Sequence, residues 1–193
     1  MDILGFDTYT ESLTDGLQVL RYNLTTAYVP HLDWIDDPSK KEEHDYDSAG
    51  KGSNRFATIL LYMSDLAEND GGETAFAKGL PADQPVEERV MLPAAMEALR
   101  ASGDVKDLLK RGSWEERMVA QCRSQLSMRP HSIRAVLFYS QNPNGTVDNN
   151  SLHGGCPVAG GEKWGESFLC VCVATAVLSR GLMFSRCAFR KEA

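Results

Sequence analysis

The stretch "RFATILLYMSDL", Arg55–Leu66, says most about the fold class of this 193-residue chain. It is strongly apolar and rich in residues that favour strands, until Ser64 and Asp65 end the run. A short apolar run of this kind is typical of a strand in a buried sheet. "SIRAVLFYSQ", residues 132–141, has the same character, so we expect a β core built from segments far apart in the chain.

Further strand signals flank this core on both sides. "GLQVLRYNL" alternates and predicts a strand over about Leu17–Leu24. "AYVPHLDWI" is expected to be extended, because Pro30 restricts the residue before it. "AENDGGETAF" predicts a turn that leads into a short strand. "ESFLCVCVATAVL" predicts a final core strand from about Phe168 to Ala174.

The character changes between residues 80 and 130, where helix-forming residues recur at helical spacing. We expect two or three short helices there, broken near Pro93 and at Gly103 and Gly112. This helical insert is interpreted as a decoration or a lid rather than as a second active module. With strands on both sides of it, the sequence predicts one mainly β domain over residues 1–193, with flanking helices.

Composition limits the classes of function. The formal net charge of -7 argues against a general nucleic-acid binder, which usually shows a basic face. No run of about 18 or more apolar residues appears, so no membrane span is encoded here. The acidic start "MDILGFDTYTESLTDG" lacks the layout of a signal peptide. The five cysteines include a CxC pair but no CxxC, so buried thiols are favoured over a zinc site.

Two residues in "PHLDW" form the first part of a candidate metal site. Residues i and i+2 of an extended chain face the same way, so His31 and Asp33 can present an imidazole and a carboxylate to one point. A distant histidine would complete a facial triad, which holds non-haem Fe(II) and leaves positions open for O2 and a co-substrate. The alternative for His31 alone is a structural role. Of the other histidines, His44 is interpreted as solvated and His131 as a surface or strand-edge residue.

The distant partner is expected in "SLHGGCPVAGGEKWG", Ser151–Gly165, which reads as neither a helix nor a strand. The stretch holds His153 and, ten residues later, Lys163, with turn-forming residues between them. His153 can close a metal site. Lys163 can supply a cation for the far carboxylate of 2-oxoglutarate, whose keto-acid end chelates iron. The plain alternative is that Lys163 is an exposed surface lysine.

Six motifs stand in the same order as in a known family. They are "LQVLRY", "YVPHLDW", "RFATILLYMSDL", "GGETAF", "NGTVDNNSLHGGCPV" and "GEKW", and they run from about Asp15 to Trp164. Together they resemble the catalytic domain of the prolyl 4-hydroxylase family of Fe(II)- and 2-oxoglutarate-dependent dioxygenases. The resemblance implies a double-stranded β-helix, or jelly roll, with a helical insert at about 80–130.

The resemblance also implies roles for individual residues. His31, Asp33 and His153 match the iron ligands of the family, and Lys163 matches the lysine that binds the 2-oxoglutarate tail. Tyr22 and Thr74 match positions that hydrogen-bond the co-substrate. Tyr28 and Arg55 match positions that line the peptide groove. For Tyr22 and Thr74, a plain packing role remains the alternative. Cys156 in "HGGCPV" is interpreted as a packing residue.

The activity implied by the resemblance is hydroxylation of peptidyl proline at the 4-position, which consumes O2 and 2-oxoglutarate and releases succinate and CO2. Ascorbate, a proline-containing peptide or protein substrate, and a place in the endoplasmic reticulum or secretory pathway are implied in the same way. One alternative is a related dioxygenase that acts on another side chain or a small molecule. The other is a catalytically silent binding module with the same fold.

The chain departs from the family pattern at both ends. It begins almost at the first groove strand, so we expect a truncated N-terminal part, and it is atypical after residue 165. Leu169 stands where an aromatic residue is expected, and the tail after Ser179 is expected to pack loosely. These departures concern substrate binding and stability, and they leave the iron and 2-oxoglutarate residues intact.

Overall fold

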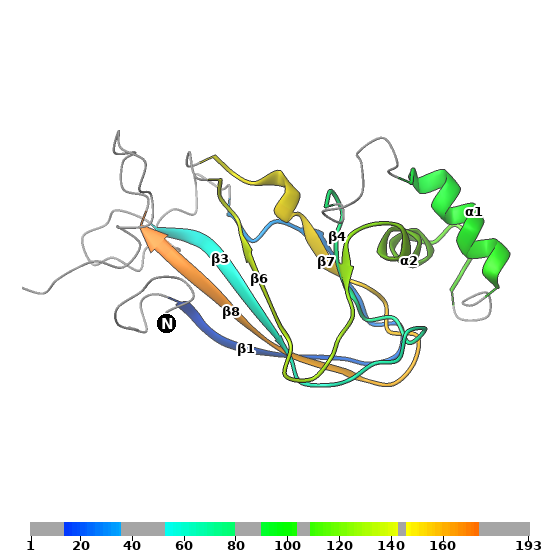
Figure 1. The fold of residues 1–193 in the computed structure, drawn as a ribbon, viewed down its shortest axis with the longest axis horizontal. Coiled ribbons are helices and arrows are strands. Elements are labelled where there is room, and N and C mark those ends of the chain that lie inside the picture. The colour runs from blue at the N-terminus through cyan, green and yellow to red at the C-terminus, as the bar shows by residue number, and fades with distance from the viewer. Residues whose placement is uncertain (1–13, 36–52, 80–89, 104–108, 143–145, 174–193) are drawn as a thin grey trace, which may run out of the picture.

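Two antiparallel β-sheets face each other in the computed structural model, which describes residues 14–35, 53–79, 90–103, 109–142 and 146–173 (Figure 1). The strands are β1 Thr14–Tyr22, β2 Tyr28–His31, β3 Ser53–Tyr62, β4 Thr74–Phe76, β5 Ser127–Met128, β6 Ala135–Tyr139, β7 His153–Gly155 and β8 Lys163–Val173. One sheet has the strand order β1-β8-β3-β6 and the other β2-β7-β4-β5. Two four-stranded sheets of this kind form a jelly roll, which confirms the expected fold class.

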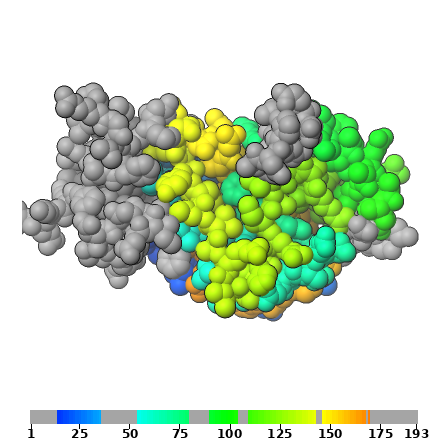
Figure 2. All heavy atoms as spheres, in the orientation of Figure 1, coloured from blue at the N-terminus to red at the C-terminus, as the bar shows by residue number. Residues whose placement is uncertain are grey.

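Two helices, α1 Leu92–Ser102 and α2 Trp114–Ser124, lie outside the sandwich. They pack on each other on the side of β4 and β7, and they form a block at one end of the molecule (Figures 1 and 2). A short 3-10 helix, Asn149–Ser151, precedes β7. Among the described residues, no helix is long and apolar enough to span a membrane.

Strand β1 shows why the sheet β1-β8-β3-β6 has two different faces. Successive side chains of a strand point to opposite sides. Gln18, Leu20 and Tyr22 therefore point between the two sheets, where they line a cavity. Leu17 and Val19 point the other way and are 49% and 55% exposed. The alternation predicted for this stretch thus separates a cavity face from an outer face.

The helical insert differs in detail from the prediction. Pro93 does not break a helix; it lies in the first turn of α1, where its missing N–H costs no hydrogen bond. Gly103 ends α1 in the left-handed conformation, as expected of a glycine cap. Ser113, just after Gly112, caps α2, because its side chain accepts a hydrogen bond from the N–H of Glu116. Helix boundaries therefore lie at both glycines and near Pro93, where α1 begins, and residues 80–89 fall outside the described part of the chain.

Several strand boundaries also shift. Strand β1 begins at Thr14 and ends at Tyr22, earlier than the predicted Leu17–Leu24. The "SLHGGCPVAGGEKWG" stretch is not strand-free, because it contains β7 and the start of β8 at Lys163. The insert contains β5, which no sequence pattern indicated. The predictions for His44, for Ala174 and for the tail after Ser179 fall outside the described residues.

A disulfide between Cys122 and Cys156 overturns the prediction of buried thiols at these two positions. It joins helix α2 to the residue that directly follows β7, across 34 residues of sequence. Both cysteines are almost fully buried and pack with Ala75 of β4 and Met118 of α2. Cys156 therefore does more than pack: it ties the helical insert covalently to the strand that carries His153.

Removing this disulfide is expected to lower the free energy of unfolding by about 2–4 kcal/mol, because an open chain of this length has more conformational freedom when unfolded. The measurement is urea unfolding of the Cys122→Ser and Cys156→Ser variants, with and without reductant. Reductant should destabilise the unmodified chain and leave both variants unchanged. Equal midpoints for the unmodified chain in the two buffers would contradict the prediction.

Candidate active site

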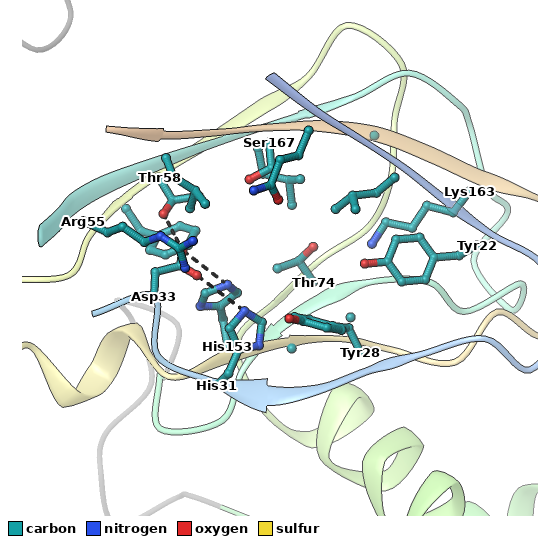
Figure 3. A pocket seen from close by; sticks show the side chains of 18 residues that line it. Tyr22, Tyr28, His31, Asp33, Arg55, Thr58, Thr74, His153, Lys163 and Ser167 are labelled. Atoms are coloured by element: carbon teal, nitrogen blue, oxygen red, sulfur yellow. Dashed lines mark hydrogen bonds and ion pairs between the residues drawn. The ribbon is translucent and has the colours of Figure 1, made fainter. Parts of the chain in front are cut away.

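A cavity of about 330 Å³ lies between the two sheets (Figure 3). All the site residues predicted from the sequence line it: His31, Asp33, His153, Lys163, Tyr22, Thr74, Tyr28 and Arg55. Figure 3 shows the two histidines and Asp33 toward one end, Lys163 and Tyr22 at the other, and Thr74 between them. The structure therefore joins all the predicted residues in one site with two chemically different ends.

The two histidines meet because of the register between β2 and β7. These strands pair antiparallel, with His31 directly opposite His153. Their ring centroids lie 4.5 Å apart. Gly154, in the middle of β7, has no room for a side chain, because a Cβ there would lie 2.8 Å from the carbonyl oxygen of Tyr28 on β2. The glycine in "HGG" thus lets the two histidine-bearing strands come close.

Hydrogen bonds orient both imidazole rings. His31 Nδ1 lies 2.9 Å from the carbonyl oxygen of Val29, and His153 Nδ1 lies 2.8 Å from that of Ser151. A carbonyl oxygen only accepts, so each Nδ1 carries a proton, and Nε2 is the ring nitrogen left to bind a metal. Burial lowers the pKa of His153, which favours the neutral, ligand-competent form.

The third member, Asp33, lies just beyond the end of β2 and is 4% exposed. Its Oδ1 lies 3.4 Å from His31 Nε2, and its Oδ2 lies 3.8 Å from His153 Nε2. The hydroxyl of Thr58, on β3, donates a hydrogen bond to Oδ2. Burial alone would raise the pKa of Asp33, but the contacts with His31, His153 and Thr58 outweigh it and lower the pKa. The carboxylate is therefore ionised at neutral pH.

This donor set fits a divalent transition metal. One ligand atom from each of His31, Asp33 and His153 lies within 4.8 Å of the others. Two neutral imidazoles and one carboxylate on one side of an ion are the set found in non-haem Fe(II) oxygenases. The backbone carbonyls that bind each Nδ1–H are outer partners of the kind that usually orient metal-bound histidines.

The other end of the cavity holds a buried amine. Lys163 is 3% exposed, and its Nζ lies 5.0 Å from the ring centroid of Tyr22 and 5.6 Å from that of Tyr62. Within the described part of the chain, Lys163 forms no ion pair closer than 4.0 Å. Burial lowers the pKa of Lys163 to about 8, although the charge of Glu73 opposes the change. Among the described residues, this buried cation therefore has no anionic partner within ion-pair distance, which is unfavourable without a ligand.

Two hydroxyl groups stand near this amine. Tyr22 lies directly opposite Lys163 in the β1–β8 pairing, and burial raises the pKa of its phenol, so the phenol is a neutral donor. Thr74 is 2% exposed, and its Oγ1 has no hydrogen-bond partner among the described residues. An unsatisfied buried hydroxyl between an amine and a metal-type cluster fits a polar ligand that spans the cavity.

Tyr28 and Arg55 line different parts of the cavity. Tyr28 is 51% exposed, and its ring meets that of His31 edge-on, with centroids 4.3 Å apart. Arg55 Nε donates a hydrogen bond to Asp15 Oδ2 at 2.7 Å. Asp15 reaches this face because β1 has an irregular register between Thr14 and Leu17, where Gly16 has a φ of 81°.

Sequence reasoning missed Thr58, which lines the cavity and contacts Asp33. It also missed Asp15 and Asn54, which contact Arg55 and the backbone of Ile35. The glycine at position 16 inside a strand pattern was a usable sign of a bulge near Asp15. Leu169, which replaces the expected aromatic residue, is 5% exposed and lines the cavity. His131 lies on the surface, as predicted, and pairs with Asp65.

Comparisons with known proteins agree with this geometry. A family model described as the 2OG-Fe(II) oxygenase superfamily matches residues 17–167. Over 154 residues the chain is 36% identical to the probable prolyl 4-hydroxylase 8 of Arabidopsis thaliana, which covers 79% of this chain and 40% of that protein. Prolyl 4-hydroxylase 5 of the same plant is 33% identical over 153 residues, with 79% and 40% covered. The chain thus spans about 40% of the length of these curated relatives.

Among solved structures, the chain is similar to a viral collagen prolyl hydroxylase from Paramecium Bursaria Chlorella virus-1, determined as a 2OG complex. The sequence identity is 20% and the TM-score is 0.47, and the match covers 82% of this chain and 57% of that chain.

Proposed function

Because this chain belongs to the 2OG-Fe(II) oxygenase superfamily, we propose that it is the catalytic core of an enzyme that hydroxylates peptidyl proline at the 4-position. In this proposal His31, Asp33 and His153 bind Fe(II), and Lys163 binds the far carboxylate of 2-oxoglutarate. Tyr22 and Thr74 donate hydrogen bonds to the co-substrate, and Tyr28 and Arg55 line the peptide groove. The products are hydroxyproline, succinate and CO2.

One observation carries the proposal: a single cavity holds a two-histidine, one-carboxylate cluster at one end and an unpaired buried lysine at the other. A small dicarboxylate that chelates a metal through one end satisfies both at once. The names of the curated relatives favour proline as the residue that is hydroxylated.

In this proposal the residues of the chain bind the metal, orient the co-substrate and exclude water. Bound Fe(II) would supply the activation of O2, which no protein side chain provides. The charged amine of Lys163 neutralises the far carboxylate, and Thr74 offers its unsatisfied hydroxyl along the length of the ligand. Burial of Asp33, His153 and Lys163 keeps the site dry, so side reactions with water are suppressed. In this proposal Tyr28 and Arg55, which line the cavity, hold the peptide with its proline over the metal site.

We also propose ascorbate as the reductant that restores oxidised iron, and a place in the endoplasmic reticulum or secretory pathway. The disulfide between Cys122 and Cys156 supports that compartment, because disulfides persist in oxidising environments and are rare in the cytosol.

The direct test is production of succinate from 2-oxoglutarate with Fe(II) and O2, assayed with a panel of proline-rich peptides. Hydroxyproline and succinate in the same reaction would support the proposal. Succinate without hydroxyproline, but with hydroxylation of another peptide side chain or a small molecule, would support a related dioxygenase. Tight binding of 2-oxoglutarate with no succinate would instead indicate a silent binding module.

The affinity for 2-oxoglutarate is expected to fall as the pH rises from 7 to 9. The pKa of Lys163 in the free site is about 8, so the amine is mainly charged at pH 7 and mainly neutral at pH 9. If the bound carboxylate holds the proton on Lys163, the loss is about tenfold across this range. Calorimetric titration with Mn(II) in place of Fe(II) measures it. The matched control is Lys163→Met, whose weaker affinity should change little with pH; an equal fall in both proteins would assign the effect to another group.

Turnover of 2-oxoglutarate is expected to be poorly coupled to peptide hydroxylation, because Leu169 supplies a smaller wall than an aromatic ring. A loosely held peptide reacts slowly, since misplacement by about 1 Å can cost about 10²-fold in rate. The ratio of hydroxyproline to succinate should lie well below one and rise in Leu169→Trp. A ratio near one in the unmodified chain would contradict this expectation.

A further inference from the structure

The buried carboxylate of Asp33 stands on a segment with little regular structure of its own. Strand β2 ends at His31, so Asp33 lies in the bend that follows. The terminal torsion of an aspartate is broad, so the side chain alone does not fix the plane of the carboxylate relative to the histidines. Some other part of the molecule has to fix this orientation.

Strand β3 provides two contacts to this segment. Thr58, which is 2% exposed, donates its hydroxyl to Asp33 Oδ2, as the dashed line in Figure 3 shows. With Oδ2 held there, Oδ1 stands 3.4 Å from His31 Nε2. A threonine hydroxyl has one proton, so it selects a single carboxylate oxygen as its acceptor.

The second contact lies two residues further along. Asn54 Oδ1 accepts a hydrogen bond from the N–H of Ile35 at 3.0 Å, and Asn54 Nδ2 donates to the Ile35 carbonyl at 2.8 Å. The amide side chain thus pairs with the backbone of Ile35 as a neighbouring strand would. The same Oδ1 also accepts from the N–H of Arg55 at 2.8 Å, which fixes the amide plane.

We propose that β3 is the template for the metal-binding carboxylate: Thr58 positions the Asp33 side chain, and Asn54 positions the backbone that carries it. Thr58 and Asn54 are positioning residues, since they act through Asp33 and Ile35. This inference rests on the metal site of the proposed function. It assigns to β3 a task beyond its place in the sheet.

Binding of Mn(II) to the full chain without 2-oxoglutarate tests the inference, with free Mn(II) measured by electron paramagnetic resonance. Thr58→Val keeps the size of the side chain but removes the donor, and it should weaken Mn(II) binding by about 10–100-fold, the usual effect of losing an outer partner of a ligand. Thr58→Ser keeps the donor and should restore most of the affinity. In an Asp33→Ala background, Thr58→Val should cause no further loss.

Asn54→Leu should weaken Mn(II) binding by a smaller factor and speed hydrogen exchange at the Ile35 amide, whereas Asn23→Leu, on an exposed turn, should do neither. Urea unfolding of the metal-free variants identifies any that do not fold, and Thr58→Ala replaces Thr58→Val if needed. Folded Thr58 variants that bind Mn(II) as well as the unmodified chain would overturn the inference alone. No Mn(II) binding by the unmodified chain would instead overturn the proposed metal site.

Discussion

Replacing Asp33 by alanine is expected to abolish metal binding by this protein at micromolar concentrations. The carboxylate is the only anionic group of the described three-residue cluster, and a neutral water molecule in its place would not supply its charge. Loss of an outer partner already costs about 10–100-fold in affinity, so loss of the anionic ligand should cost more than about 100-fold.

Anaerobic titration with Fe(II) and 2-oxoglutarate measures this loss through the weak visible charge-transfer band of the chelate. His31→Ala should lose the band as well. Asp33→Glu should weaken it, since one extra methylene moves the carboxylate away from both histidines. The matched control is His131→Ala, because His131 is exposed and pairs with Asp65 at the surface. A band of equal strength in Asp33→Ala would remove this carboxylate from the site.

Replacing Lys163 by methionine is expected to weaken binding of 2-oxoglutarate and, in the ligand-free protein, to raise the free energy of unfolding. Binding of 2-oxoglutarate should weaken by about 10²-fold or more, because a buried carboxylate left without its partner costs about 3–5 kcal/mol. Metal binding should be nearly unchanged, since Lys163 lies at the other end of the cavity. Lys163→Arg should keep the charge but misplace it, and so recover only part of the affinity.

The metal-free and ligand-free protein should, by contrast, gain stability from Lys163→Met at pH 7. The pKa of the buried amine falls from 10.5 to about 8, which corresponds to a cost of about 3 kcal/mol for keeping it charged in the fold. This cost is present in full below pH 8 and shrinks as the pH rises toward the unfolded value. Urea unfolding at pH 7 and pH 10 should show a clearly smaller advantage of methionine at the higher pH.

Lys110→Met, on the surface, is the matched control for both effects. If Lys163→Met instead lowered the stability of the free protein and left 2-oxoglutarate affinity unchanged, Lys163 would be a structural residue, and another cation such as Arg55 or Arg134 would have to meet the carboxylate.

The identity of the candidate site residues was accessible from the sequence because each belongs to a short, local motif. The "HLD" and "HGG" stretches contain the two histidines and the aspartate, and the order of the six motifs indicates the other candidate site residues. The strand pairing that brings these residues together could not be predicted from the sequence. The pairing of His31 with His153 depends on the register between two strands far apart in the chain, which no local pattern encodes.

The failure to predict Thr58 has its physical origin in interrupted periodicity. The register between β3 and β8 shifts between Arg55 and Ala57, so simple alternation does not place Arg55 and Thr58 on one face, although both line the cavity. The disulfide was missed because five cysteines allow many pairings, and only the packing of α2 on β4 brings Cys122 to Cys156.

The strand order has a consequence for how the chain can be made in a cell. Arg21 and Glu162, which meet where β1 lies beside β8, are 141 residues apart. At about 5–20 residues per second, a ribosome needs on the order of 10 s to synthesise that interval. Until then β1 lacks its neighbour and His31 has no His153 to face. The cluster of His31, Asp33 and His153 can therefore form only after His153 has been synthesised and β7 has paired with β2.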